Sequence, residues 1–416
     1  MGLAITNATL DGAAVGLRCA GAVIESIGPG VEPQPGDTVL DGSGRALIAG
    51  TINAHTHAAM TLFRGYADDL PLMEWLSKHI WPAERRLERE DVYWGSRLAC
   101  LEMARSGTIR FWDMYWKQAE TARAVRDAGL RAVIGAPLID DSDPERTPAL
   151  LEKARRSLDE IVEAGDGAVT AALAPHAIYT VSEPSLRGIA EISAEREVPV
   201  HIHLSETEGE VAGCLDQHGI RPAFYLDRCG LLGPRTLLAH CVWLDRDEID
   251  LIAERGATMV TNPVANLKLA VGGVFPYLDA RAAGAKVALG TDGAGSNNSL
   301  DLLDDVKAFA LLQKHVAADP AAVTAAEAWE VATGRRSELI GEPTLEPGAP
   351  ADFALVRLDA PGLALGELDA GLVYAADASA VAATVVGGRV VYRQGELGDR
   401  EEIVAKARER AAILFG

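Results

Sequence analysis

Residues 46–57 read ALIAGTINAHTH, an apolar run of strand length that ends in two histidines. Seven further runs of this kind follow along the chain, and segments with helical patterning separate them. They read TIRFWDMY (108–115), RAVIGAPLID (131–140), AVTAALAPHAIYT (168–180), VPVHIHLSE (198–206), TLLAHCVWL (236–244), ATMVTNPVAN (257–266) and KVALGTDG (286–293). Strands that alternate with helices are typical of β-α-β units and a parallel sheet. Eight such units predict an α/β fold, a closed (β/α)8 barrel of the TIM type.

The two ends of the chain have a different character. Residues 3–10, 20–28 and 37–42 read as short strands with Gly-rich turns, and segments 350–358 and 381–397 return to that pattern. We therefore expect a small β-sandwich domain built from residues 1–48 and 346–416, ending in an amphipathic helix over 401–415. The barrel is expected to occupy residues 49–345. A barrel of this type commonly takes about 250 residues, so a chain of 416 residues leaves room for the smaller domain.

The composition argues against several classes of function. Lys and Arg number 39 and Asp and Glu number 60, so the formal net charge is 39 − 60 = −21. Such an acidic surface repels phosphate groups, and we expect neither nucleic-acid binding nor binding to anionic membranes. The five cysteines are scattered without a C-x-x-C pair, which favours reduced thiols in a cytoplasmic protein. We expect no secretory signal and no membrane-spanning segment.

Histidines gather where the predicted strands end. Six of the nine do so, together with one aspartate that ends the eighth run: His55, His57, His176, His201, His203, His240 and Asp292. The C-terminal strand ends of a barrel converge on one mouth, where active sites of this fold are built. Polar, titratable groups are costly in a packed core. We therefore place the candidate site there and assign no chemistry to the helical histidines His79, His218 and His315.

His55 and His57 are spaced so that both imidazoles point to one face of a strand. This spacing alone also fits two exposed or hydrogen-bonded histidines. His203 and Asp292 strengthen the metal interpretation, because three imidazoles and a carboxylate suit Zn²⁺ or another divalent transition metal, with a position left for water. We favour His203 over His201 as the ligand because it lies nearer its strand end, which leaves His201 as a supporting or structural histidine.

Each remaining candidate has a structural alternative. Asp292 by itself would cap a helix, but beside a metal it can also accept the proton of bound water. Glu206 is either a solvated charge at a helix start or a carboxyl within reach of a substrate nitrogen. His240 and His176 are either structural or, at the barrel mouth, a group that orients the nucleophile and a hydrogen-bond partner of a heterocycle.

Taken together, these segments resemble the amidohydrolase superfamily, and within it the 5′-methylthioadenosine/S-adenosylhomocysteine deaminase group. The similarity covers nearly the whole barrel in the right order. It lies in NAHTHAAMTLFRGYADDLPLMEWLSKHIWPAE (53–84), APHAIYTVS (174–182), HIHLSETEGEV (201–211), LLAHCVWL (237–244), NPVANLKLAVG (262–272) and ALGTDGAGSNNSLDLL (288–303). The segment GAPADFALV (348–356) extends it into the small domain.

The resemblance implies a role for each site residue. One divalent ion is held by His55, His57, His203 and Asp292, with Zn²⁺ foremost and Fe²⁺, Ni²⁺ or Mn²⁺ acceptable to the same ligands. The ion makes hydroxide available near neutral pH, Asp292 takes a proton, Glu206 shuttles a proton to the ring, and His240 assists the attack.

The resemblance also implies the contacts to substrate. His176 contacts the purine, Glu84 binds the ribose hydroxyls, and Trp75 or Trp81 lines the nucleoside pocket. Without the resemblance, Glu84 would be interpreted as a charge on a helix surface.

The implied activity is hydrolytic deamination of a 6-aminopurine nucleoside to the 6-oxo nucleoside and ammonia, by a homo-oligomer, either dimer or tetramer. Members that use S-adenosylhomocysteine are expected to offer basic residues after the third strand. Here that loop reads LIDDSDPERTP (138–148), with Arg146 as its only cation. We therefore favour 5′-methylthioadenosine, adenosine or 5′-deoxyadenosine. The alternatives are a related hydrolase acting on a triazine, guanine, a pterin or a pyrimidine, and a noncatalytic barrel scaffold.

Overall fold

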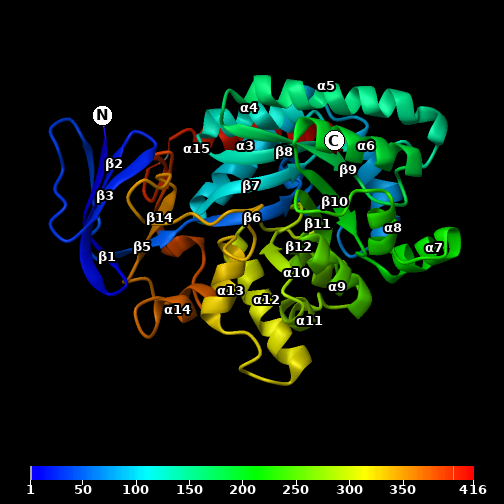
Figure 1. Ribbon diagram of the computed structural model, residues 1–416. Helices are drawn as coiled ribbons and strands as arrows, with labels where there is room; N and C mark the ends of the chain where they lie inside the picture. Colours follow the sequence, from blue (N-terminus) through cyan, green and yellow to red (C-terminus); the bar gives the residue numbers. More distant parts are fainter. Residues whose placement is uncertain (1, 397) are drawn as a thin grey trace.

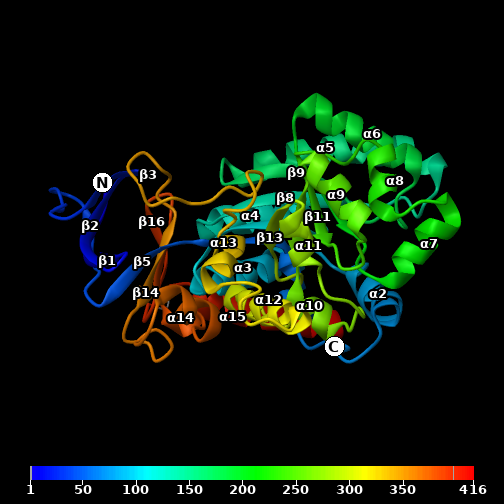
Figure 2. The same cartoon turned by 60° about the horizontal axis from the view of Figure 1, so that its bottom comes forward.

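Two separate sheets organise the protein, a parallel barrel and a smaller mixed sheet. The structure is a computed structural model that describes residues 2–396 and 398–416. Figures 1 and 2 both place the smaller sheet, with the N-terminus, at one end of the barrel. The predicted architecture, a barrel with a small domain built from both chain ends, is confirmed. Leu397, the last residue of the predicted segment 381–397, lies outside the described residues.

Eight parallel strands form the barrel sheet, and they lie side by side in sequence order. They are β6 (Thr51–Thr56), β7 (Thr108–Met114), β8 (Arg131–Leu138), β9 (Val169–Pro175), β10 (Val200–Leu204), β11 (Thr236–His240), β12 (Thr258–Thr261) and β13 (Lys286–Leu289). After β13, the N–H groups of Thr291 and Asp292 donate to the His55 carbonyl at 3.2 and 3.0 Å. These bonds close the sheet onto β6. Each of the eight apolar runs contains one barrel strand, as predicted, and the first run (46–57) also contains most of β5 (Arg45–Ala49), a strand of the smaller sheet.

Helices connect these strands and surround the ring (Figure 2). They are η1 (Ala58–Phe63), α1 (Leu72–Glu74), the π-helix η2 (Trp75–Ile80), α2 (Trp81–Glu84), α3 (Arg89–Arg105), α4 (Gln118–Ala128), η3 (Pro144–Arg146), α5 (Thr147–Gly165), α6 (Glu183–Arg196), α7 (Glu208–His218), α8 (Pro222–Arg228), α9 (Arg246–Arg255), α10 (Pro263–Lys268), α11 (Tyr277–Ala282), α12 (Leu302–Ala317) and α13 (Ala325–Ala332). Helices α4 and α9 end at Gly129 (φ 74°) and Gly256 (φ 73°), a left-handed conformation that glycine adopts without strain.

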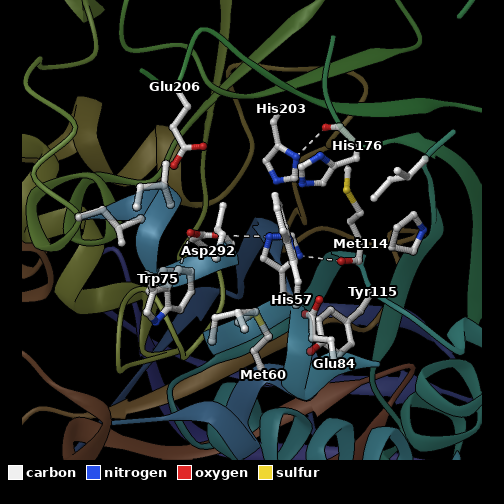
Figure 3. A pocket seen from close by; sticks show the side chains of 18 of the residues that line it. His57, Met60, Trp75, Glu84, Met114, Tyr115, His176, His203, Glu206 and Asp292 are labelled. Atoms are coloured by element: carbon white, nitrogen blue, oxygen red, sulfur yellow. Dashed lines mark hydrogen bonds and ion pairs between the residues drawn. The ribbon is translucent and has the colours of Figure 1, made fainter. Parts of the chain in front are cut away.

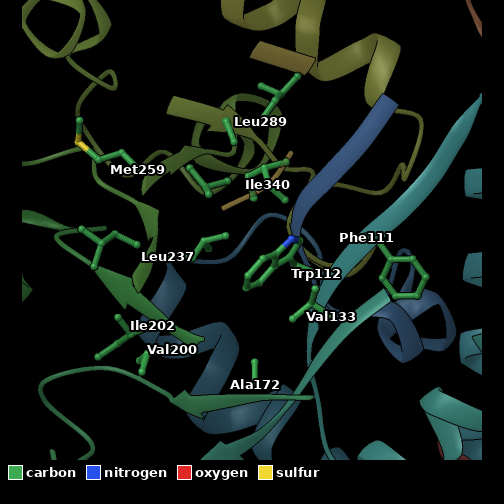
Figure 4. Packing of buried hydrophobic residues seen from close by; sticks show 14 of the residues in the cluster. Phe111, Trp112, Val133, Ala172, Val200, Ile202, Leu237, Met259, Leu289 and Ile340 are labelled. Atoms are coloured by element: carbon green, nitrogen blue, oxygen red, sulfur yellow. The ribbon is translucent and has the colours of Figure 1, made fainter. Parts of the chain in front are cut away.

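Large apolar side chains fill the barrel and the layer beneath its helices (Figure 4). Trp112, Ile202, Leu237 and Met259 are each at most 1% exposed. Burying one such side chain contributes about 1.5–3 kcal/mol. This close packing holds the strand ends rigidly, and the site residues are attached to those ends.

The small domain is an eight-stranded sheet in the order β16-β15-β14-β5-β1-β2-β3, with β4 paired to β1. Its strands are β1 (Leu3–Leu10), β2 (Ala13–Ala20), β3 (Val23–Gly28), β4 (Thr38–Asp41), β5 (Arg45–Ala49), β14 (Phe353–Arg357), β15 (Val381–Val386) and β16 (Arg389–Arg393). The antiparallel pair β5–β14 joins the two ends of the chain. The domain has its own apolar core, which includes Leu17, Ile24, Leu47 and Phe353.

The last helix, α15 (Arg400–Phe415), packs on α3 and η1 of the barrel. The Arg410 guanidinium Nε lies 2.6 Å from Oδ1 of Asp91 on α3 and fixes this contact. Two short helices, α14 (Leu368–Tyr374) and η4 (Ala378–Ala380), lie between β14 and β15. Within the described part of the chain, no helix has both the length and the apolar character needed to cross a bilayer.

Candidate metal centre and active site

The strand ends bring the predicted metal ligands together at one mouth of the barrel. His55 lies in β6, His57 follows it directly, His203 lies in β10, and Asp292 follows β13. Figure 3 shows His57, His203 and Asp292 converging from these elements. Oδ1 of Asp292 lies 3.2 Å from Nε2 of His55 and 3.1 Å from Nε2 of His57. The His203 ring centroid is 4.9 Å from that of His55.

His240, the last residue of β11, belongs to the same cluster. Its ligand atom and those of His55 and His203 all lie within 4.8 Å of one another, as do those of His55, His57 and Asp292. The geometry therefore brings the four predicted ligands together and places His240 within the same reach.

Hydrogen bonds to backbone oxygens determine the tautomers of two cluster histidines. Nδ1 of His57 donates to the Met114 carbonyl at 2.6 Å, and Nδ1 of His203 donates to the His176 carbonyl at 2.7 Å. Because a carbonyl oxygen only accepts, each neutral ring carries its lone pair on Nε2. On a neutral His57 this lone pair would face a carboxylate oxygen, a repulsion that a proton or a metal ion between the two atoms would relieve. The donor set therefore fits a divalent metal.

The electrostatics of the cluster agree with this fit. Burial lowers the pKa of His55 to about 3 and that of His203 well below its usual value, so both rings stay neutral and able to bind a metal. At His57 burial opposes the charged form, but the Asp292 carboxylate outweighs it and raises the pKa to about 9. A carboxylate this deep requires a neighbouring positive charge, which a protonated His57 or a metal ion supplies.

Three residues at this mouth have a strained backbone conformation. Ser205, His240 and Asp292, which lie at the ends of three barrel strands, have φ values of 50°, 73° and 61°. Non-glycine residues rarely adopt this left-handed conformation, and it clusters at functional sites. Oδ2 of Asp292 also accepts a hydrogen bond from the Ser296 hydroxyl at 2.5 Å. The chain thus holds these side chains in orientations that an unstrained strand end would not give.

Glu206 and His240 lie side by side in the cavity, each held by a partner that the sequence analysis missed. The backbone N–H groups of Ser205 and Glu206 donate to the Glu210 carboxylate at 2.9 and 3.0 Å. Nδ1 of His240 donates to the Asn266 amide oxygen at 2.9 Å and lies 3.8 Å from Oε1 of Glu206. Burial raises the pKa of Glu206, which favours a carboxyl that can carry a proton near neutral pH.

A solvent-connected cavity opens at this mouth. Its polar lining includes His57, His203, Glu206, His240 and Asp292. The predicted substrate contacts Trp75, Trp81, Glu84 and His176 also line it. Much of the remaining wall is apolar: Met60, Leu72, Leu76, Ile80, Ile139 and Leu269. The cavity therefore combines a polar floor with walls suited to a flat, largely apolar ligand.

Glu84 at the end of α2 is turned toward the cavity. Oε2 of Glu84 accepts a hydrogen bond from the Trp116 indole N–H at 3.0 Å, and burial raises the pKa of this carboxyl. Trp116 and its neighbour Tyr115 follow β7 and line the cavity, and the sequence analysis missed both. Their position directly after the second apolar run is the signal that could have found them.

The model of the amidohydrolase family matches residues 46–391 of this chain. The chain belongs to the amidohydrolase family. This amidohydrolase is 45% identical over 379 residues to a protein of Methanoregula boonei named 5'-deoxyadenosine deaminase, with 90% of this chain and 86% of the relative covered. It is 43% identical over 406 residues to the 5-methylthioadenosine/S-adenosylhomocysteine deaminase 1 of Archaeoglobus fulgidus, with 96% and 95% covered.

A solved structure shares the fold of this amidohydrolase. It is an adenosine deaminase from Xanthomonas campestris with bound zinc, and it superposes with a TM-score of 0.86 at 35% identity. The match covers 96% of this chain and 93% of that structure. The predicted membership of the superfamily is thereby confirmed.

The remaining histidines do not take part in lining the cavity. His201 is fully buried behind His55, and Nε2 of His201 lies 2.7 Å from Nδ1 of His55. His79 in η2, His218 at the end of α7 and His315 in α12 do not line the cavity, among the residues that the structure describes.

Proposed function

We propose that this amidohydrolase converts a 6-aminopurine nucleoside and water to the 6-oxo nucleoside and ammonia. The observation that carries the proposal is the convergence, in one cavity, of the His and Asp cluster, the Glu206 carboxyl and the buried Glu84 carboxyl. The names of the two relatives and of the solved structure, all deaminases of adenosine-type nucleosides, support it. The proposal extends to residues 49–345 as the catalytic barrel, with 1–48 and 346–416 as the small domain.

His55, His57, His203 and Asp292 would hold one divalent ion. Zinc is our first choice, because three imidazoles and a carboxylate suit it and because the similar Xanthomonas structure contains zinc. Iron, nickel or manganese remain acceptable to the same donors. When bound, such an ion lowers the pKa of water toward about 7 and supplies the nucleophile.

The chain's own residues then move the protons. Asp292 accepts a proton from the attacking water through its carboxylate, and the Ser296 hydroxyl holds the second oxygen in place. Glu206, whose pKa is raised by burial, delivers a proton to the ring nitrogen beside C6. The proton taken by Asp292 then passes to the amino group, which leaves as ammonia, and the proton of the new C6 hydroxyl returns to Glu206. His240 donates its Nδ1 proton to Asn266, so its Nε2 is turned away from that partner and is available to orient the attack.

The wall of the cavity would hold the rest of the nucleoside. His176, with Nδ1 3.0 Å from the Thr180 hydroxyl, contacts the purine. Glu84 accepts from Trp116 at one oxygen, which leaves carboxylate lone pairs for the two ribose hydroxyls. Trp75 and Trp81 cover the faces of the ligand.

The surroundings of Arg146 favour a substrate with an uncharged 5′ substituent. Arg146 forms ion pairs with Asp141 and Asp143 and does not line the cavity, among the described residues. Its charge is therefore already compensated, and the nearby cavity wall is apolar. We favour 5′-deoxyadenosine, 5′-methylthioadenosine or adenosine over S-adenosylhomocysteine, whose carboxylate would lack a partner.

A panel of substrates tests the proposal. Purified protein is given 5′-deoxyadenosine, 5′-methylthioadenosine, adenosine, S-adenosylhomocysteine and the free base adenine, and the absorbance drop on deamination is followed. We expect kcat/KM to be high for the first three and much lower for adenine. Equal turnover of adenine, or turnover only of a triazine, guanine, a pterin or a pyrimidine, would instead support the related hydrolases.

Assembly and location stay predictions. The family resemblance supports a homo-oligomer, and the scattered cysteines, all buried and unpaired, support a reducing compartment such as the cytoplasm.

A further inference from the structure

Most histidines of the metal cluster have their tautomer fixed by an oxygen atom, but His55 does not. Nδ1 of His55 faces a second imidazole, with Nε2 of His201 at 2.7 Å. An imidazole nitrogen can either donate or accept, so this partner leaves two arrangements open. Both rings are 0% exposed, so no bulk water competes for the contact.

In the first arrangement, Nε2–H of His201 donates to Nδ1 of His55. The proton of His55 then sits on Nε2, which lies 3.2 Å from Oδ1 of Asp292 without forming a hydrogen bond to it. A protonated Nε2 has no lone pair, so His55 cannot bind a metal in this state.

In the second arrangement, Nδ1–H of His55 donates to Nε2 of His201. Nε2 of His55 then presents a lone pair to the cluster, and the proton of His201 sits on Nδ1. That nitrogen has no hydrogen-bond partner among the described residues. The Trp112 ring beside it stands nearly perpendicular, with centroids 6.0 Å apart, and an indole N–H only donates. Within the described part of the chain, each arrangement therefore leaves one buried N–H without an acceptor, Nε2–H of His55 in the first and Nδ1–H of His201 in the second.

We propose that His201 is a positioning residue: its Nε2 accepts Nδ1–H of His55 and so keeps the Nε2 lone pair of His55 directed at the metal site. The inference rests on the proposed role of His55 as a metal ligand. It assigns His201 to metal affinity and not to the reaction with substrate.

Two substitutions separate this role from simple packing. His201→Phe keeps a ring but removes the acceptor for Nδ1–H of His55, whereas the amide oxygen of His201→Gln can accept it. The dissociation constant for Zn²⁺ is measured on metal-stripped protein by competition with a chelator. We expect His201→Phe to weaken binding about 10- to 100-fold, and His201→Gln to stay within about threefold of the wild type. His315→Phe, on the exposed face of α12, is the control and should leave the constant unchanged.

A measurement on the unaltered protein keeps the inference testable if His201→Phe does not fold. Histidine labelled with ¹⁵N reports by chemical shift which ring nitrogen carries the proton. With Zn²⁺ bound, we expect both His55 and His201 to carry their proton on Nδ1, so that Nε2 of His201 is the acceptor of the contact. A proton on Nε2 of His201 in the Zn²⁺-bound protein, or equal Zn²⁺ affinities for the wild type and His201→Phe, would overturn the inference.

These experiments require no substrate, so a negative result for His201 can be told apart from a failure of the proposed function. Protein that binds no Zn²⁺ would contradict the proposed function itself. Protein that binds Zn²⁺ with an affinity insensitive to residue 201 would contradict only the role of His201.

Discussion

The two carboxylate oxygens of Asp292 face different groups. This arrangement accounts for the proposal that Asp292 both binds the metal and accepts a proton. Oδ1 faces the nitrogens of His55 and His57, and Oδ2 is held by the Ser296 hydroxyl. Asp292→Asn replaces an oxygen that can take a proton with an amide group that cannot. We expect kcat for 5′-deoxyadenosine to fall at least about 100-fold. Steady-state kinetics with metal analysis of the same sample checks this, and a metal-loaded variant with near-normal kcat would contradict it.

In the proposed mechanism Glu206 delivers a proton, so its isosteric amide should fail at that step alone. Glu206→Gln is expected to lower kcat at least about 100-fold while the protein keeps its metal. Glu208, exposed in the first turn of α7, offers a matched control, and Glu208→Gln should leave kcat within about twofold, as is usual for surface substitutions. Equal kinetics for the two variants would remove Glu206 from the mechanism.

Glu84 is expected to affect binding more than chemistry, because it lies in the wall of the cavity and not among the metal ligands. Glu84→Ala removes hydrogen bonds from a charged acceptor, which contribute about 1.5–3 kcal/mol each. KM for adenosine should therefore rise about 10- to 100-fold with a smaller change in kcat. Trp116→Phe, which removes only the indole donor to Glu84, should give a smaller rise. A fall in kcat at constant KM would place Glu84 in the chemical step instead.

The sequence predicted which proposed metal ligands come together more completely than it predicted the residues that hold them. His55, His57, His203 and Asp292 end apolar runs, and strand ends of a barrel must converge. Asn266, Ser296 and Trp116 make their contacts through loops, whose paths depend on tertiary packing that no periodic pattern records. The contact between His201 and His55 was missed for a related reason. Predicting it requires the relative stagger of two strands that are distant in the sequence, and the sequence pattern does not give that stagger.

At the scale of single elements, the start of α7 determines where the Glu206 carboxyl stands. Glu210 on this helix accepts the N–H groups of Ser205 and Glu206 and so fixes the backbone that carries the acid. Glu210→Ala should lower kcat about 10- to 100-fold through misplacement of Glu206, with little change in metal content. Glu208→Ala on the same turn is the control, and similar kinetics for both would show that the bonds to Glu210 do not position the acid.

In the small domain, Arg18 on β2 and Asp37 ahead of β4 form an ion pair whose contribution to stability depends on pH. The Arg18 guanidinium, 2.7 Å away, lowers the pKa of Asp37 from 3.8 to about 2. Because the pKa of Asp37 is lower in the folded protein than in the unfolded chain, the ion pair stabilises the folded state above pH 3.8. This stabilisation is lost as the pH falls toward 2. The difference in Tm between the wild type and Asp37→Asn should therefore be constant near neutral pH and shrink in acid. A difference independent of pH would contradict the ion pair.

The elements themselves were predictable to different degrees. Buried parallel strands are continuous apolar runs, so all eight barrel strands could be located from the sequence. The segment from α1 to α2 was not, because it combines a three-residue helix, a π-helix and a four-residue helix without a repeating pattern. That segment carries Trp75, Trp81 and Glu84, which only the family resemblance identified.

For the whole molecule, the barrel supplies a rigid ring of strand ends, and we propose that the loops after those strands select the substrate. The net charge of −21 suits a neutral substrate better than an anionic one. The ion pairs of Arg146 with Asp141 and Asp143 point the same way. Neutralising this loop tests the idea: Asp141→Asn with Asp143→Asn frees Arg146 and should raise kcat/KM for S-adenosylhomocysteine relative to 5′-deoxyadenosine, measured in competition. An unchanged ratio would show that the loop does not select the 5′ substituent.

The account depends most on the requirement for a metal ion in the deamination of a 6-aminopurine nucleoside. The most direct measurement follows turnover of 5′-deoxyadenosine while a chelator withdraws the metal and Zn²⁺ is then returned, with bound metal determined at each step. Activity should fall in proportion to bound metal, vanish in the stripped protein and return at about one ion per chain. Sustained turnover in fully stripped protein would contradict the account.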